Sequence, residues 1–239
     1  MKFLKLEKRN KISYVSFTRT KSLNALNSHT LRELINLNKE LDNDVNTKVI
    51  VYRSEGKNFS AGADIKEHQK KLSKLQIWKS NLGKEAIESI LKINQITIAS
   101  LRGYCLGGAA CIASACDFRV ASETTLVAYP EIDLGMNLNW FGLPLLLRLI
   151  GPSKTKKMVI SGETENANDL FRWGFIDELY KDEDLDNRTA SFAKKYASKP
   201  TLPAQMIKRS VNALTYQSDQ AIMHMDYDQF LLSREFHGK

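Results

Sequence analysis

Short apolar runs with the repeat of β-strands recur through the first half of the chain. The KISYVSF segment (11–17) alternates apolar and polar residues, which predicts a half-buried strand. The KVIVY run (48–52) and the ITIASL run (96–101) are short and rich in β-branched residues, as expected of buried strands. FRVAS (118–122) and TLVAY (125–129) have the composition of further strands. The first 130 residues are therefore expected to supply a sheet.

Helical patterns lie between these runs and dominate the rest of the chain. From Ser28 to Asp42, apolar residues at positions 31, 34, 35, 37 and 41 form one stripe, with Ser28 as the expected N-cap. A Lys-rich stretch (66–93) and the GGAACIASAC segment (107–116), opened by two glycines, predict two more helices. From about Trp140 onward the pattern is almost entirely helical, with interruptions expected at Gly151-Pro152, Gly162 and Pro203.

Strands that alternate with helices, followed by a helical stretch, are typical of an α/β domain with a largely parallel sheet. No internal repeat, low-complexity tract or Pro/Gly/Ser linker divides the chain. We therefore expect one structural unit, with an α/β core over residues 1–190 and a helical C-terminal region over residues 191–239.

Composition narrows the class of protein. Hydrophobic content of 43% and charged content of 26% are ordinary for a globular protein. No apolar run approaches the ~18–20 residues of a membrane span, and MKFLKLEKRN (1–10) lacks the features of a secretory signal. The cysteines at 105, 111 and 116 have no zinc or redox spacing. We expect free thiols in a reducing compartment, and so a cytoplasmic protein without a membrane partner.

The net charge of +8 raises the question of a nucleic-acid partner. The lysines are spread along the chain in runs of two at most, and no nucleic-acid-binding motif accompanies them. We interpret the charge as a solvated basic surface and expect no nucleic-acid partner. The alternative is that some of these lysines meet a polyanionic small molecule.

Two glycine-bearing loops follow buried strands. The first is FSAGADIKE (59–67), after the KVIVY strand, and the second begins GYCLGGAAC (103–111), after the ITIASL strand. Each is expected to open a helix, whose first N–H groups are unpaired, and small side chains let a ligand oxygen approach such groups. Tight packing of a helix on a strand also explains small residues at such a loop, so either loop alone leaves both interpretations open.

The residues of these loops, with other motifs in the same order, resemble the enoyl-CoA hydratase/isomerase (crotonase) family. The resemblance covers nearly the whole chain and rests on RTKSLNALN (19–27), FSAGADIKE, GYCLGGAACIASACDFRVAS (103–122), YPEIDLG (129–135) and RLIGPSKTKKMVISGE (148–163). It implies a crotonase-like ββα spiral core with an α-helical C-terminal trimerisation region. It also implies an acyl-CoA thioester substrate, a homo-oligomer (trimer or hexamer), no metal, and no cofactor beyond the CoA that is part of the substrate.

The resemblance also implies an oxyanion hole built from two backbone N–H groups, those of Ala63 and Gly108. Removing a proton from the α-carbon of a thioester creates an enolate, whose charge lies on the thioester oxygen. Fixed N–H donors in a dry site stabilise that charge, each by roughly 2.7–4 kcal/mol. Residues implied to contact CoA or substrate are Lys21, Ser22, Leu23, Ala61, Asp64, Ile65, Lys66, Cys111 and Trp140. Lys66 is expected one turn into a helix, where it meets a CoA phosphate or simply faces solvent.

Family hydratases use two carboxylates, and this chain has only one of them. The glutamate of the P-E-I motif is Glu131, whereas the other acid's position holds Cys111. A thiol is a poor base in an apolar setting and has no histidine motif beside it, so we interpret Cys111 as a packing residue in the pocket wall. Burial by Ile132, Leu134 and Met136 is expected to raise the pKa of Glu131. The alternative for Glu131 is a solvated or capping glutamate, and Asp133 is the reserve acid.

The segment after Glu131 departs from the family pattern. Many hydratases have L-G-x-x-P-G-x-G-G there, whereas this chain has LGMNLNWFGLP (134–144), with Trp140 and Phe141 in place of glycines. The acyl pocket is therefore expected to be reshaped, with Asn137 and Asn139 available to a polar acyl group or a water.

A lone glutamate favours a proton shuttle. We expect isomerisation of a 3-enoyl-CoA to a 2-enoyl-CoA, in which Glu131 removes the α-proton and returns it at the γ-carbon. One alternative is an enoyl-CoA hydratase that uses Glu131 and an ordered water. Another, of a different class, is a protein that binds CoA thioesters without catalysis.

Overall fold

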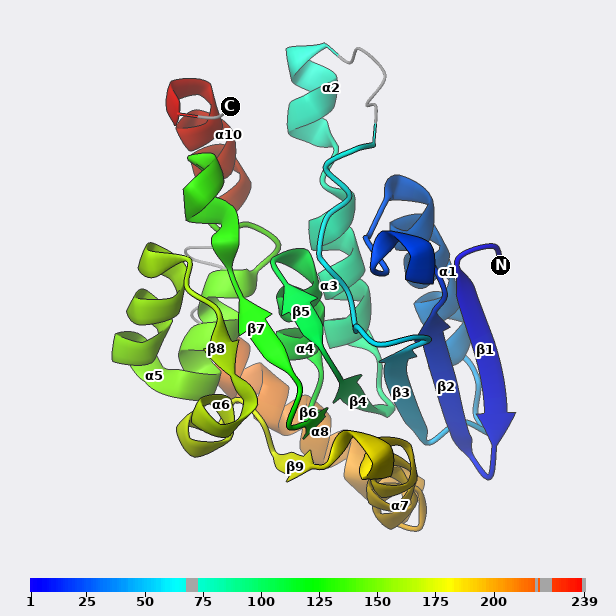
Figure 1. Cartoon of the computed structure of the whole chain (residues 1–239). Coiled ribbons are helices and arrows are strands. Elements are labelled where there is room, and N and C mark those ends of the chain that lie inside the picture. The colour runs from blue at the N-terminus through cyan, green and yellow to red at the C-terminus, as the bar shows by residue number, and fades with distance from the viewer. Residues whose placement is uncertain (68–72, 218, 220–224, 238–239) are drawn as a thin grey trace.

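The computed structural model describes residues 1–67, 73–217, 219 and 225–237 (Figure 1). Its strands are β1 (Leu4–Arg9), β2 (Ile12–Phe17), β3 (Val49–Ser54), β4 (Ile96–Leu101), β5 (Tyr104–Leu106), β6 (Phe118–Ser122), β7 (Leu126–Ala128), β8 (Glu165–Asn166) and β9 (Glu178–Tyr180). Its α-helices are α1 (Ser28–Asp42), α2 (Lys74–Lys79), α3 (Leu82–Lys92), α4 (Gly108–Ala115), α5 (Gly142–Ser161), α6 (Ala167–Trp173), α7 (Leu185–Ala197), α8 (Thr201–Tyr216) and α10 (Asp226–His237). The short 3₁₀ helices are η1 (Thr20–Ser22), η2 (Pro130–Leu134) and η3 (Asp182–Asp184).

A central sheet organises these elements. Within the described residues it has six strands in the order β1-β2-β3-β4-β6-β9. The pair β1–β2 is antiparallel and every other neighbouring pair is parallel. A smaller sheet, β5-β7-β8, carries the second glycine loop. The largely parallel sheet predicted from the alternation of strands and helices is confirmed.

Side chains of the central sheet alternate between two hydrophobic cores. In β3, Ile50 and Tyr52 lie in the larger core with α1, α3, α4 and α5, whereas Val49 and Val51 lie in a smaller core with α7. Helices therefore cover both faces of the sheet, which is why β3 is a continuous apolar run. The same cover corrects the expectation of a half-buried strand at 11–17, because every residue of β2 is buried.

Helix α1 has the bounds predicted from its apolar stripe, but its N-cap is one residue earlier. The side chain of Asn27 accepts a hydrogen bond from the N–H of Thr30 (2.8 Å), so Asn27 and not Ser28 is the cap. Asn and Ser are comparably good N-caps, so the sequence pattern did not distinguish Asn27 from the adjacent Ser28.

The single helix predicted over residues 66–93 is wrong. Residues 68–72 lie outside the described residues, and α2 and α3 are separate helices, the second capped by the Asn81 side chain. Lys66 precedes both helices, so its expected position one turn into a helix is also wrong. Residues 59–67 of the first glycine loop contain no helix, whereas the second loop opens α4 at Gly108.

The C-terminal part is mainly helical, as predicted, although it also contains the short strands β8 and β9. Gly151 has non-helical angles inside α5 (φ 72°, ψ 172°) and Gly162 ends that helix, so both interruptions are confirmed. Pro203 interrupts nothing, because it lies in the first turn of α8, where its missing N–H costs no helical hydrogen bond. Helix α7 crosses residue 190, and the division into a core (1–190) and a C-terminal region (191–239) stays a prediction.

A buried ion pair anchors α8 to the central sheet. Lys208, the single buried residue of this fully described helix, donates to the carboxylate of Asp117 (2.7 Å) and to the carbonyl of Gln95 (2.7 Å). The same Asp117 oxygen accepts hydrogen bonds from the N–H (2.7 Å) and the hydroxyl (2.9 Å) of Thr97 in β4. Asp117, which directly precedes β6, therefore joins α8 to the interior strand β4 of the central sheet.

Asp117→Asn is expected to lower the free energy of unfolding by about 3 kcal/mol, because it leaves the Lys208 ammonium group buried without a counter-charge. The matched control is Glu88→Gln, which breaks the exposed Lys92–Glu88 pair and is expected to cost less than about 0.5 kcal/mol. Urea unfolding curves measure both. Equal losses in the two variants would contradict the anchoring role of Asp117.

Candidate active site

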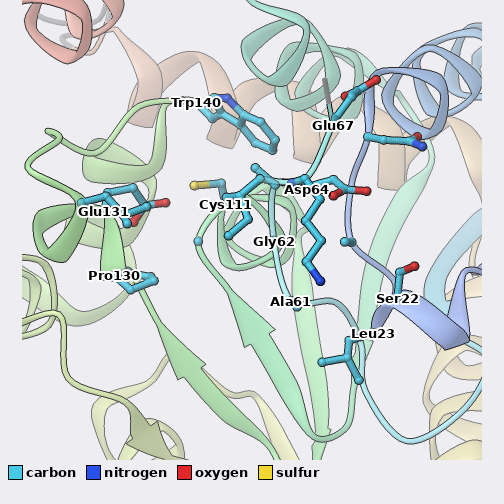
Figure 2. A pocket seen from close by; sticks show the side chains of 18 of the residues that line it. Ser22, Leu23, Ala61, Gly62, Asp64, Glu67, Cys111, Pro130, Glu131 and Trp140 are labelled. Carbon is cyan, nitrogen blue, oxygen red and sulfur yellow. Dashed lines mark hydrogen bonds between the residues drawn. The ribbon is translucent and has the colours of Figure 1, made fainter. Parts of the chain in front are cut away.

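A cavity of about 950 Å³ opens between the two glycine loops and η2 (Figure 2). Every site residue predicted from the sequence lies on its wall, the catalytic candidates as well as the CoA-contacting ones. Residues not predicted there include Arg19, Ala25, Asn27, Glu67, Gly107, Pro130 and Phe230. Most of these residues belong to the motifs quoted above, so their place on the cavity wall could have been predicted from the sequence. Phe230, in α10, belongs to none, so the sequence offered no means of placing it.

The two glycine loops are held together by backbone hydrogen bonds. The N–H of Ser60 donates to the carbonyl of Tyr104 (2.9 Å), and the N–H of Leu106 donates to the carbonyl of Ser60 (3.1 Å). At Gly62 the backbone has φ +85°, and a methyl group there would lie 2.4 Å from the carbonyl oxygen of Leu106. Only glycine permits both this conformation and this approach. The sequence therefore needs Gly62 to bring the loops into contact.

The N–H groups of Ala63 and Gly108 lie at this contact. On either side of Ala63 the backbone is engaged, since Gly62 accepts from Leu26 (2.8 Å) and Asp64 donates to Leu26 (3.1 Å). Gly108 is the first residue of α4, so its N–H has no partner within the helix. Among the described residues, neither N–H donates a hydrogen bond. Two free donors on one cavity wall can hold an oxygen that acquires negative charge.

Glu131 extends from η2 into the cavity, and Figure 2 shows its carboxylate turned toward Cys111. A methyl group at Gly107 would lie 2.8 Å from Oε1, and Oε2 is buried without a hydrogen-bond partner among the described residues. This burial raises the pKa of Glu131 to about 7. The expected cause was wrong for Ile132, which is exposed and lies outside the cavity wall, whereas Leu134 and Met136 belong to the wall that encloses the carboxylate.

Asp133, the reserve acid, lies outside the cavity. Its carboxylate oxygen is close to Gly162 at the end of α5, where a methyl group would lie 2.9 Å from it. The 3₁₀ turn of η2 directs residues 131 and 133 to different sides. Asp133 is therefore no second acid for this site.

Cys111 is packed into the cavity wall. Its thiol is fully buried, donates weakly to the carbonyl of Asn139 (3.8 Å) and fills the space beside Gly142. Burial raises the pKa of this thiol well above its usual range, and the nearby Glu131 carboxylate adds to the effect. A thiol that stays protonated is neither a base nor a nucleophile near neutral pH, which agrees with the packing role inferred from the sequence.

The other two carboxylates on the cavity wall have strong partners. Asp64 pairs with Arg19 (2.8 Å) and accepts from the N–H of Lys66 (3.1 Å). Glu67 accepts from the N–H (2.8 Å) and the hydroxyl (2.6 Å) of Ser28 at the start of α1. Figure 2 places both on the side of the pocket opposite Glu131. On the described wall, Glu131 is therefore the carboxylate that has a buried oxygen without a hydrogen-bond partner.

A strained turn separates η2 from α5. Trp140 (φ 58°) and Phe141 (φ 54°) both adopt the left-handed conformation, which costs a bulky residue on the order of 1–3 kcal/mol. The N–H of Trp140 donates to the side chain of Asn139 (2.6 Å), and the N–H of Phe141 donates to Asp226 of α10 (3.1 Å). Burial raises the pKa of Asp226, whose other oxygen is buried without a partner among the described residues.

The two asparagines of this segment differ in their access to the cavity. The Asn139 oxygen already accepts from Trp140 and from the side chain of Asn81 (3.1 Å). Asn137 does not line the cavity, and its amide donates to Gln229 of α10 (2.9 Å). The expectation that Asn137 is available to a polar acyl group or a water was therefore wrong, because its amide fastens the turn to α10. The amide nitrogen of Asn139 donates no hydrogen bond among the described residues and Asn139 lines the cavity, so its availability stays a prediction.

A family model described as Enoyl-CoA hydratase/isomerase matches residues 7–238. The chain belongs to this family. A short-chain-enoyl-CoA hydratase of Clostridium acetobutylicum is 31% identical over 209 residues, which cover 87% of this chain and 80% of that protein. A crotonyl-CoA hydratase of Syntrophomonas wolfei is 30% identical over 227 residues, which cover 94% and 87%. The resemblance inferred from the motifs is confirmed.

The family fold is confirmed as well. A probable enoyl-CoA hydratase of Mycobacterium thermoresistibile has a TM-score of 0.90 at 23% identity, over 99% of this chain and 98% of that chain. This likeness shows the crotonase fold predicted for the chain, with its C-terminal helix.

The cysteines are free, as predicted, and all three are buried. No helix in the described part of the chain is both long and apolar enough for a membrane span. Across the same residues, no three His, Cys, Asp or Glu side chains come together in a group suited to a metal ion. The cytoplasmic location and the absence of a cofactor stay predictions.

Glu131→Gln is expected to raise the free energy of unfolding by up to about 3 kcal/mol at pH 8. The pKa of Glu131 is about 7 in the folded protein against an ordinary value of 4.5, and each unit is worth about 1.36 kcal/mol. The desolvation penalty is absent below pH 4.5, grows between pH 4.5 and 7, and is complete above it. Urea unfolding of both proteins at pH 5 and pH 8 measures the difference. A gain of stability that is equal at both values would show that the carboxylate is not desolvated.

Proposed function

We propose that this enzyme moves the double bond of a 3-enoyl-CoA into conjugation, giving a 2-enoyl-CoA, with Glu131 as its only acid–base group. The observation that carries the proposal is the difference between the carboxylates on the described cavity wall. Asp64 and Glu67 are engaged by neighbouring groups, whereas Glu131 has a buried oxygen without a partner. The position of a second acid holds Cys111, whose pKa is raised.

The proposed reaction needs no water. The Glu131 carboxylate takes a proton from the α-carbon, and the electron pair of that C–H bond moves into the conjugated system. Negative charge then collects on the thioester oxygen, where the N–H groups of Ala63 and Gly108 stabilise it. The Glu131 carboxylic acid returns the proton to the γ-carbon. A pKa of about 7 suits both steps, because the group gives and takes a proton with little bias near neutral pH.

Hydration of a 2-enoyl-CoA is the second candidate, because relatives at 30–31% identity carry hydratase names. In that reaction Glu131 takes a proton from a water that adds to the β-carbon, and the α-carbon must then be protonated. Cys111 is unsuited to that second task, since its thiol lies buried with a raised pKa. A protein that binds CoA thioesters without turnover is the candidate of another class.

Glu131→Gln is expected to lower kcat for a 3-enoyl-CoA by about 10²–10⁴-fold, because the amide neither takes nor returns the proton. Cys111→Ala, a matched buried variant on the facing wall, is expected to keep most of the activity. The wild-type kcat/KM should rise about tenfold per pH unit below pH 7 and level off above it, since the carboxylate is the reactive form. Ultraviolet absorbance of the conjugated product follows each reaction.

Activity and binding measurements with 3-enoyl-CoA and 2-enoyl-CoA distinguish the three candidate functions. Greater turnover of 2-enoyl-CoA to the 3-hydroxy product than of 3-enoyl-CoA would replace isomerase by hydratase. Tight binding of both thioesters without turnover, unchanged in Glu131→Gln, would favour the non-catalytic binder. Loss of activity in a folded Cys111→Ala variant would overturn the role assigned to Glu131 alone.

We also propose that the chain forms a homo-oligomer, a trimer or a hexamer, with α8 at the interface. One side of α8 carries large apolar side chains that are 51–78% exposed, namely Leu202, Met206, Ile207, Val211 and Leu214. Their spacing along the helix places them on a single face. A contiguous apolar face of this kind is typical of a surface covered by another protein.

The double variant Val211→Glu with Leu214→Glu is expected to elute as a smaller species than the wild type, because two carboxylates would be desolvated in the contact. The control is Gln205→Glu, on the other side of the same helix, which should leave the size unchanged. Size-exclusion chromatography with light scattering gives the masses. A wild-type protein that is monomeric at micromolar concentration would end the proposal.

A further inference from the structure

The indole of Trp140 is wedged between two helices that each present a glycine to it. A methyl group at Gly83 of α3 would lie 1.6 Å from the nearest indole atom, and one at Gly108 of α4 would lie 2.1 Å from another. The ring therefore fills the space that any larger residue at either position would occupy. The crevice between α3 and α4 is closed by a side chain that belongs to neither helix.

The ring also lies beside the end of the cavity where the thioester oxygen is predicted to bind. Gly108 carries one of the two N–H groups predicted to hold the thioester oxygen, and the indole packs against the same residue. Figure 2 shows Trp140 above the space between Glu131 and Asp64, with Cys111 beneath it. An acyl group bound by Gly108 therefore meets the indole soon after its reacting carbons.

The backbone holds this ring in place at a cost in strain. Trp140 and Phe141 are consecutive left-handed residues, and separate side chains, Asn139 and Asp226, accept their N–H groups. A turn with glycines would adopt the same conformation without strain. Strain that persists beside a functional site points to a role for the side chain that it positions.

We propose that Trp140 is a specificity-determining residue that plugs the crevice between α3 and α4 and restricts the cavity to short acyl groups. The proposal rests on the proposed function only in that the cavity binds acyl-CoA thioesters. Longer linear acyl groups need the space now filled by the indole. Glycine at position 140 removes the ring and suits the backbone conformation, so it opens the crevice without new strain.

Binding measured without catalysis tests the plug directly. Saturated four-carbon and ten-carbon CoA thioesters have no double bond to move, and isothermal titration gives their affinities. The wild type is expected to favour the four-carbon thioester. Trp140→Gly should raise the ten-carbon to four-carbon affinity ratio by about tenfold or more, a size typical of apolar pocket changes. Trp140→Leu, which retains an apolar side chain, should give an intermediate ratio and serves if the glycine variant unfolds.

Phe141→Gly is the matched control. It relieves strain in the same turn and keeps the N–H that donates to Asp226, but Phe141 does not line the cavity. Its affinity ratio should equal that of the wild type. The proposal is overturned if the wild type binds both thioesters equally, if Trp140→Gly leaves the ratio unchanged, or if folded Trp140→Gly loses both affinities alike.

Turnover is the second readout and separates this inference from the proposed reaction. With 3-enoyl-CoA substrates of four and ten carbons, the kcat/KM ratio should shift in the same direction as the affinity ratio. Absence of turnover in every protein, with the affinity ratio shifted as expected, would contradict the isomerase proposal but support the role of Trp140 as a plug. Turnover of 3-enoyl-CoA with an unshifted affinity ratio would support the isomerase proposal and contradict the role of Trp140 as a plug.

Discussion

The site depends on the contact between two backbone segments, residues 59–63 and 104–108. Reciprocal hydrogen bonds at Ser60 hold the segments in register, and Gly62 lets them approach without a side chain between them. Neither segment alone makes a site, because each offers a single free N–H. Since the donors belong to the main chain, the fold itself sets their spacing, and a bound oxygen meets donors that need no rearrangement.

Desolvation raises the pKa of Glu131 to a value that suits proton transfer near neutral pH. The three carboxylates on the described cavity wall differ in their surroundings. Two accept hydrogen bonds from nearby groups, whereas one oxygen of Glu131 has no partner among the described residues. Low polarity penalises the charged form and moves the pKa toward neutrality, where a carboxyl group both takes and gives a proton readily. The cost in folding free energy and the benefit in reactivity have the same physical origin.

The Trp140–Phe141 turn shows how the family fold accommodates an acyl pocket that differs from the pocket expected with glycines at these positions. The polypeptide keeps a conformation that suits glycine, but it carries two aromatic side chains, held by acceptors on Asn139 and Asp226. Asp226 lies in α10, which also contributes Phe230 to the cavity wall. The C-terminal helix therefore shapes the reacting end of a site whose other parts come from the first 140 residues.

The sequence by itself determined the family, the parallel sheet and many of the residues around the cavity, because short motifs of small residues and a P-E-I glutamate are local features. It failed where distant segments decide the outcome. The burial of β2 on both faces and the partners of Asn137 and Asn139 depend on segments far apart in the chain. Only the tertiary structure decided which carboxylate lacks a partner and what fills the crevice beside Gly108, since desolvation and steric contact arise between residues that no local pattern connects.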